Sequence, residues 1–151
     1  TIKSKINLAK PDAKVTTPIT STIKALKKLD IKKISIFTPY TNAINNSVVN
    51  YFKKENISVN SLTYFDIASD LDIGKIDENY LFEVLSKIDL EDSDALFVSC
   101  TALPVLSIID KLEKKLNKII LSSNQTLIWD ALHLIGNKDP VVGFGKIFEA
   151  N

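Results

Sequence analysis

The chain has 151 residues, of which nineteen are basic and eighteen acidic, giving a formal net charge of +1 at pH 7. This length suits one ordinary domain with a buried core. The balanced charge provides no long-range field for a polyanion or an anionic membrane, so we expect neither nucleic acid nor a membrane as partner. The sequence has no apolar run of the roughly 18 residues that span a bilayer and no signal-peptide pattern, which predicts a cytoplasmic location.

Residue usage also limits the possible cofactors. The single cysteine, Cys100, cannot form an internal disulfide or supply a cysteine-rich zinc site. No cluster of histidine, cysteine and carboxylate residues has the spacing of metal ligands, so we expect no metal. The four glycines form neither a G-x-G-x-x-G motif nor a Walker motif. This pattern therefore disfavours nucleotide cofactors.

The first half of the chain predicts two strands and two helices after an N-terminal segment, residues 1–16. A hydroxyl cap at Thr16 and Thr17, followed by Pro18, predicts a helix start. The apolar face of this helix is formed by Ile19, Ile23, Leu26 and Leu29. A strand over 34–38 ends at Pro39, and Thr41 opens a helix. We expect the apolar side of that helix to be Ile44, Val48, Tyr51 and Phe52.

The second half repeats this alternation. A strand near 59–65 and an irregular stretch over 66–77 precede a helix that turns Leu81, Val84, Leu85 and Ile88 inward. The strand over 95–99 contains three consecutive apolar residues, as in a central strand with both faces covered. A helix with Val105, Ile108, Ile109, Leu112 and Leu116 on one side follows it. A strand over 119–121 and a last helix over 124–135, ended by Gly136, complete the pattern.

Short β-branched runs that alternate with helical spacing indicate βαβ units. The sequence therefore predicts an α/β fold: a three-layer sandwich around a four-stranded parallel, flavodoxin/Rossmann-like sheet, with residues 17–123 forming the α/β lobe. The last helix carries apolar residues around more of its circumference than one buried stripe requires. We thus expect residues 124–151 to dock on a partner lobe or a second subunit, so the protein is either a homo-oligomer or lacks a lobe in this sequence.

Parallel sheets bind ligands beyond the carboxyl ends of their strands. Three polar segments fall there: Thr38-Pro39-Tyr40-Thr41, Ser99-Cys100-Thr101 and Ser122-Ser123-Asn124-Gln125. Cys100, where a strand gives way to a helix, is either a thiolate stabilised by backbone N–H groups and the helix dipole or an extension of the buried strand. Tyr40 is either an ordinary aromatic or a donor to an anion. His133 lies mid-helix, which favours a structural or solvent-facing role.

These segments carry a family resemblance. Val15-Thr16-Thr17-Pro18, Phe37 to Thr41, Val98 to Thr101, and Ser122 to Gln125 with Trp129 and Leu132 to Gly136 resemble, in order and spacing, the C-terminal half of the maleate isomerase and arylmalonate decarboxylase group of the aspartate/glutamate racemase superfamily. The resemblance implies two similar α/β lobes with the active site between them. It also implies cofactor-free chemistry on a small carboxylic acid, with cysteine thiols on opposite faces of the substrate.

The resemblance assigns roles to individual residues. It implies that Cys100 is the catalytic cysteine of this lobe and that Tyr40 holds a substrate carboxylate. The substrate-binding residues that we expect are Tyr40, Thr41, Asp70, Thr101, Ala102 and Asn124. Preorganised donors at such a site would stabilise an enediolate beside the thiol. Maleate isomerases carry an asparagine at about the position of Asp70, where a carboxylate would repel a dicarboxylate.

Three hypotheses follow from the sequence. The leading one is an isomerase or racemase of small carboxylic acids, in which Cys100 works with a cysteine of the first lobe. The second is a decarboxylase in which Cys100 alone donates the proton. The third is a half-length module that binds a small acid or a partner subunit without catalysis.

Overall fold

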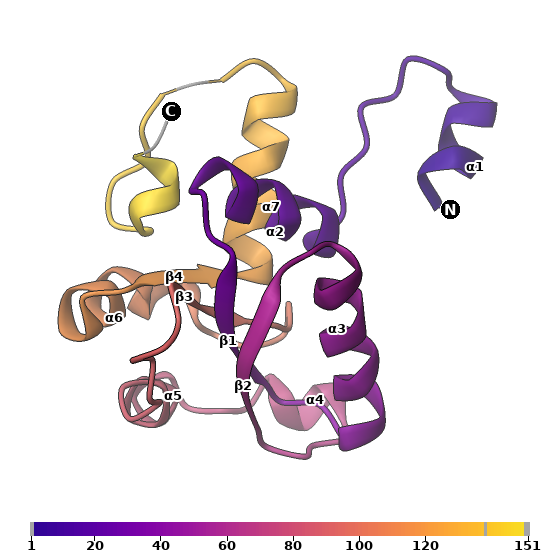
Figure 1. Ribbon diagram of the computed structural model, residues 1–151. Coiled ribbons are helices and arrows are strands. Elements are labelled where there is room, and N and C mark those ends of the chain that lie inside the picture. The colour runs from indigo at the N-terminus through magenta and orange to yellow at the C-terminus, as the bar shows by residue number, and fades with distance from the viewer. Residues whose placement is uncertain (1, 138, 150–151) are drawn as a thin grey trace.

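Four short strands form a parallel sheet at the centre of the protein (Figure 1). The computed structural model describes residues 2–137 and 139–149. The strands lie in the order β2-β1-β3-β4, and their bounds are β1 Lys33–Thr38, β2 Ser58–Tyr64, β3 Ala95–Val98 and β4 Ile119–Ser122. All three strand pairings are parallel. The predicted four-stranded parallel sheet is therefore confirmed, with strand ends within two residues of those expected.

Both faces of the sheet are covered, because side chains alternate between the faces along each strand. Ile36 and Phe97 join one apolar cluster, while Phe37 and Leu96 join the other. The first face is covered by α2 Pro18–Lys28, α3 Asn42–Lys54 and α7 Ser123–Leu134. The second is covered by α4 Asp70–Ile73, α5 Glu78–Leu85 and α6 Ile109–Leu116. The three-layer sandwich is confirmed.

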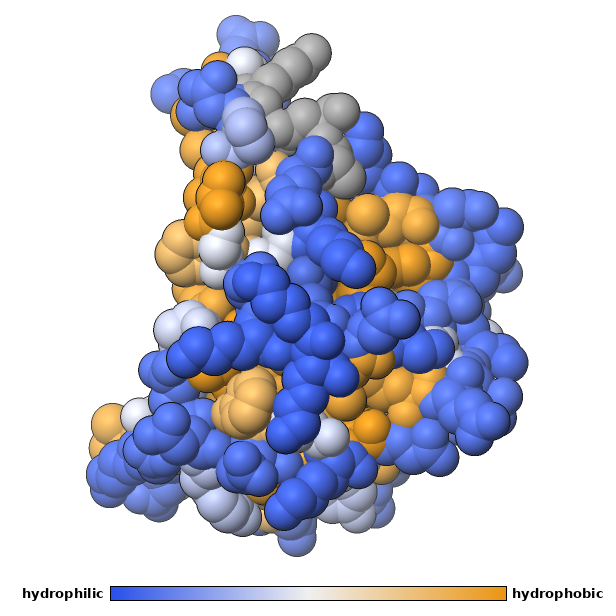
Figure 2. All heavy atoms as spheres, turned by 90° about the vertical axis from the view of Figure 1, so that its left-hand side faces the viewer, coloured by the Kyte–Doolittle hydropathy of each residue, from blue (hydrophilic) through white to orange (hydrophobic). Residues whose placement is uncertain are grey.

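Polar side chains cover most of the outer surface on the side of α6 (Figure 2). On α6 itself, Ile109 and Leu112 are buried, whereas Lys111, Lys114 and Lys115 are exposed. This is the amphipathic pattern expected of a helix that packs on a sheet. None of the helices in the described part of the chain combines the length and apolar character needed to cross a bilayer.

Two helices begin with reciprocal side-chain caps. Thr17 and Thr20 cap the start of α2, with Pro18 in the first turn as predicted. Ser122 and Gln125 form the same motif at the start of α7, directly after β4. These caps satisfy N–H groups that a helix start leaves without partners. The cap of α7 stands where the chain leaves the sheet after β4.

The structure differs from the sequence prediction at four places. A helix, α1 Ile2–Ala9, occupies part of the N-terminal segment, and the stretch over 66–77 contains α4, whose start is capped by Ser69. The helix after β3 starts late: the Val105 N–H donates to the Leu103 carbonyl, and a 3₁₀ turn, Leu106–Ile108, precedes α6. Ile44, expected on the buried side of α3, is 49% exposed.

Two buried polar side chains tie the C-terminal tail to the sheet. Gln125 accepts a hydrogen bond from the Ser122 N–H and donates one to the Phe144 carbonyl. Glu113 accepts one from the Ile120 N–H and one from the Lys146 N–H. Burial raises the pKa of the Glu113 carboxyl, and these N–H donors partly oppose that rise. The short 3₁₀ helix that follows, η2 Lys146–Phe148, is thereby held against the core.

The tail offers a matched pair of glycines as a test of this packing. Gly143 and Gly145 both have positive φ, but a Cβ atom at Gly145 would lie 2.5 Å from Gln125 Nε2 and 2.7 Å from Ile109 Cγ2, whereas one at Gly143 meets nothing within 4 Å. Gly143→Ala should cost about 1 kcal/mol of backbone strain. Gly145→Ala should cost roughly 1–3 kcal/mol more through overpacking. Urea unfolding of both variants measures the difference, and equal losses would contradict the packing described.

Candidate active site

The site lies where the sheet reverses its direction of growth. From β1 the chain returns to add β2 on one side, and from β3 it continues to β4 on the other, so β1 and β3 are neighbours at a topological switch point. Loops after such strands diverge and leave a crevice at the carboxyl edge. The loop after β1 carries Tyr40, and the loop after β3 carries Cys100.

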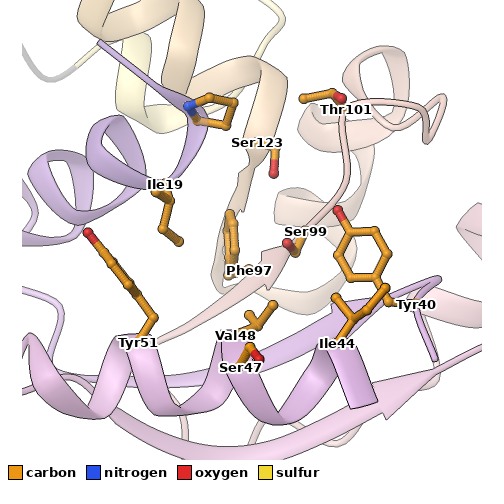
Figure 3. Close-up of a pocket in the computed structure, with 11 residues that line it drawn as sticks. Ile19, Tyr40, Ile44, Ser47, Val48, Tyr51, Phe97, Ser99, Thr101 and Ser123 are labelled. Atoms are coloured by element: carbon orange, nitrogen blue, oxygen red, sulfur yellow. The ribbon is translucent and has the colours of Figure 1, made fainter. Parts of the chain in front are cut away.

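A cavity of about 470 Å³ opens at this edge (Figure 3). Six side chains with hydroxyl groups line it: Tyr40, Ser99, Thr101 and Ser123 from the loops at the strand ends and the start of α7, and Ser47 and Tyr51 from α3. Figure 3 shows the Tyr40 hydroxyl pointing toward the side of Ser99 and Thr101. The rest of the wall comes from apolar side chains of α2, α3 and β3: Pro18, Ile19, Ile44, Val48 and Phe97. The cavity wall thus combines hydroxyl groups, four of which come from the strand-end loops and the start of α7, with apolar side chains.

Cys100 lies beside this cavity rather than in its wall. Its side chain belongs to the apolar cluster on the second face of the sheet, and the residue is 5% exposed. The Ala102 N–H donates a hydrogen bond to Cys100 Sγ at 3.3 Å, and the Cys100 N–H donates to Ser123 Oγ at 3.2 Å. The backbone φ of Cys100 is 151°, a value that residues with a side chain rarely adopt. The sulfur is buried, yet it contacts polar donors.

The phenol of Tyr40 links the cavity to this sulfur. Burial raises the pKa of Tyr40 well above its usual value of 10.0, and the interaction with the nearby Cys100 side chain raises it further. A hydrogen bond to Ser99 acts in the opposite direction, and the negative charge of Asp70 adds a small rise. At neutral pH the phenol is therefore a protonated donor that faces both the sulfur and the cavity.

One part of the sequence argument for Cys100 is wrong. No helix starts at this residue, because the chain makes turns up to the 3₁₀ helix at Leu106. The dipole of the following helix therefore does not act on the thiol. The donors that replace it are the Ala102 N–H and the Tyr40 hydroxyl. The helix start that does lie nearby is that of α7, at Ser123.

The other predicted binding residues fall into two groups. Tyr40 and Thr101 line the cavity, Ala102 contacts the sulfur, and Asn124 Nδ2 donates to the Thr101 carbonyl at 2.9 Å. Thr41 and Asp70 lie outside the cavity wall: Thr41 precedes the first turn of α3, and Asp70 is an exposed residue of α4. The charge of Asp70 is one of the causes that raise the pKa of Tyr40, and its role in substrate binding stays a prediction.

His133 lies away from the cavity wall. Its Nδ1 atom is 2.9 Å from the carbonyl oxygen of Trp129, and the two rings pack with centroids 4.6 Å apart.

Among the residues that the structure describes, no group of three or more His, Cys, Asp or Glu side chains could hold a metal ion.

Sequence reasoning missed Ser99 and Ser123 as individual site residues. Both stand in the polar segments identified at the strand ends, so their segments were found but not the residues. The contact between Ser123 and Cys100 joins residues 23 positions apart and depends on the pairing of β3 with β4. Sequence spacing alone gives no sign of it.

Comparison with known proteins adds a family to this geometry. The family model described as arylmalonate decarboxylase matches residues 5–148. Maleate isomerase from Geobacillus stearothermophilus is 27% identical over 126 residues, which cover 83% of this chain and 50% of that protein. Arylmalonate decarboxylase from Bordetella bronchiseptica is 23% identical over 137 residues, which cover 89% of this chain and 57% of that protein. The chain thus spans about half the length of the curated relatives it matches.

Solved structures agree on the fold. The maleate isomerase of Pseudomonas putida S16 superposes with a TM-score of 0.85 at 24% identity, covering 89% of this chain and 55% of the other. A mutant maleate cis-trans isomerase from Nocardia farcinica, with a covalently bound succinylcysteine intermediate, gives a TM-score of 0.89 at 20% identity, covering 99% and 63%. Because the family model matches almost the entire sequence, the chain belongs to the arylmalonate decarboxylase family.

Proposed function

We propose that this chain provides one half of a cofactor-independent isomerase or racemase that acts on a small carboxylic acid, as the maleate isomerases do. The observation that carries the proposal is a cavity at the switch point of the sheet, whose wall holds Tyr40 from the loop after β1 and the two neighbours of Cys100, Ser99 and Thr101, from the loop after β3. Relatives named maleate isomerase match most of this chain. Proton transfer at a carbon next to a carboxylate requires a group that gives or takes the proton, such as a thiol, and fixed hydrogen-bond donors that stabilise the negative charge.

The chemistry assigns a separate task to each part of the site. The substrate carboxylate accepts hydrogen bonds from the hydroxyls of Tyr40 and Thr101. In a racemase, a thiolate removes the proton from the carbon next to the carboxylate, and the electron pair of the broken C–H bond spreads over the carboxylate as an enediolate. In an isomerase, a thiolate adds to the double bond, and the electron pair of the broken π bond spreads in the same way. Rotation about the resulting single bond and release of the thiolate, which breaks the C–S bond, then re-form the double bond in the other geometry. The donors stabilise the negative charge of the enediolate because they are already oriented. Cys100 gives or takes the proton at that carbon, and a group from another lobe acts on the opposite face.

A decarboxylase is the second candidate, and two observations favour it. The apolar side chains of the cavity wall, among them Ile44, Val48 and Phe97, suit a substrate with an aryl or alkyl group better than a short dicarboxylate. The negative charge of Asp70 near Tyr40 also disfavours a second carboxylate that stays bound. In this reaction the bond from carbon to one carboxylate breaks, carbon dioxide leaves, and the Cys100 thiol protonates the enediolate. The third hypothesis, binding without catalysis, requires that neither reaction occurs.

We also propose that a further lobe or a second copy of the chain covers the exposed apolar residues of α7 and the tail. Ile128, Ile135 and Val142 are 45%, 74% and 80% exposed. A lobe or copy placed there would bury these residues, and it would supply the second half of the site if it also reaches the cavity. Measurement of the oligomeric state by light scattering distinguishes a second copy from a lobe of the same polypeptide.

The role of Cys100 is tested most directly through its thiol, the only one in the sequence. Iodoacetamide should modify Cys100, and maleate or phenylmalonate should slow the modification, whereas uncharged malonamide should not. In the complete protein, Cys100→Ser should lower turnover of the same acids about 100-fold or more while leaving the circular dichroism spectrum unchanged. Undiminished turnover, or a thiol that no reagent reaches in the folded protein, would contradict the proposed mechanism.

The role of Tyr40 is tested by a comparison of two tyrosines in the cavity wall. Tyr40→Phe should weaken the binding of maleate or phenylmalonate about tenfold, because it removes one hydrogen bond to a charged group. Tyr51→Phe, at the opposite end of the cavity, should change the dissociation constant little (Figure 3). Calorimetric titration of both variants measures the effect. Equal affinities in the two variants would remove the carboxylate-binding role of Tyr40.

The ionisation of Tyr40 predicts a difference in stability at alkaline pH. Because folding raises its pKa above 10.0, the unfolded state loses this proton first, and stability falls as pH rises from that value through the folded pKa. The unfolding free energy of the wild type should therefore fall more steeply above pH 10 than that of Tyr40→Phe. Urea unfolding across this range measures both slopes, and parallel slopes would refute the burial of a neutral phenol.

A further inference from the structure

A closed ring of three hydrogen bonds holds the turn between β1 and α3. The Tyr40 N–H donates to Thr38 Oγ1 at 3.3 Å, and the Thr38 hydroxyl donates to Asn45 Oδ1 at 2.5 Å. Asn45 Nδ2 completes the ring by donating to the Tyr40 carbonyl oxygen at 3.1 Å. Both backbone polar groups of Tyr40 are thus fixed by two side chains, one from the end of a strand and one from the first turns of a helix.

The ring lies inside the protein. Neither Thr38 nor Asn45 has any exposed surface. A buried amide loses its hydrogen bonds to water, so it must be satisfied by internal partners. Backbone contacts hold the other side of the same turn: the Phe65 N–H donates to the Thr38 carbonyl and the Ile67 N–H to the Pro39 carbonyl. The turn therefore has little freedom except through the loss of one of these bonds.

We infer that Asn45 is a positioning residue: its amide fixes the Tyr40 turn and thereby controls how the Tyr40 phenol meets Cys100. Asn45 does not line the cavity, so it acts through Tyr40 and not on the substrate. A hydrogen bond weakens steeply when its geometry is lost, and a small rotation of the turn is magnified along the tyrosine ring. The inference rests on the proposed function, because it concerns the donor and the thiol of that same site.

A second group of buried, hydrogen-bonded side chains, centred on Ser35 of β1, provides a control. Ser35 Oγ is 2.9 Å from Ser93 Oγ and accepts a hydrogen bond from Ser61 Oγ at 2.7 Å. Ser35 is as buried as Thr38 and stands in β1, but its partners lie away from the cavity. Loss of its hydroxyl costs stability without moving the Tyr40 turn. Ser35→Ala therefore reports what a merely structural change does to the thiol.

The test is the pH dependence of Cys100 alkylation by iodoacetamide, followed by mass spectrometry on the 151-residue chain, which has one cysteine. The plateau rate reports access to the sulfur, and the midpoint of the pH profile reports how well the surroundings stabilise the thiolate. Asn45→Leu should move the midpoint upward by about one pH unit, because a displaced phenol no longer donates to the thiolate; one unit corresponds to a tenfold lower thiolate fraction below the midpoint. Tyr40→Phe should move it by a similar amount, and Ser35→Ala should leave it unchanged.

The outcomes separate this inference from the proposed function. If Tyr40→Phe moves the midpoint and Asn45→Leu does not, Asn45 has no positioning role and the proposed function stands. If Tyr40→Phe leaves the midpoint unchanged, the pairing of phenol and thiol fails, and with it the proposed function. Should Asn45→Leu fail to fold, Thr38→Val breaks the same ring with a side chain of the same shape. An unchanged midpoint in a folded Thr38→Val would then overturn the inference.

Discussion

The parallel pairing of β1 with β3 is the constraint on which the candidate site depends. Ile34 pairs with Ala95 and Phe37 with Val98, and the ladder ends with the Ser99 N–H, which donates to the Phe37 carbonyl at 2.8 Å. Because this register is fixed by buried residues on both faces, a shift by one residue would turn apolar side chains to the wrong cluster. The same register brings the two loops that carry Tyr40 and Cys100 to one edge.

Around this pairing, several buried polar groups form hydrogen bonds between distant segments of the chain. The starts of α3 and α7, the loop after β3 and the C-terminal tail are each held by a side chain from another element. Gln125 is an example, since it caps α7 and also holds the tail through the Phe144 carbonyl. Because these polar groups are buried, water cannot replace a lost hydrogen-bond partner, and the loss of any of these bonds is costly. The site is therefore rigid at its base, although its wall is open to solvent.

The sequence predicted the elements that hydrophobic periodicity determines and missed those that depend on single contacts. The strands and the helix starting at Pro18 were found, since β-branched runs and a capping pattern are local signals. The late start of α6 was missed because the apolar spacing that includes Val105 continues through the 3₁₀ turn, so this pattern does not distinguish the turn from the helix. The position of the loops that follow the strands at one edge of the sheet was predictable from parallel topology. The role of Asn45 was not, because a polar residue near a helix start looks like an exposed one until the fold turns it inward.

The backbone of Cys100 has a consequence for how this position can change over evolutionary time. A φ of 151° suits glycine better than cysteine, so the thiol is kept at a place where a residue without a side chain would fit with less strain. A lineage released from the need for this sulfur could replace it by glycine in one step at little structural cost. Such a replacement at position 100 would give a protein that keeps the fold but lacks the thiol.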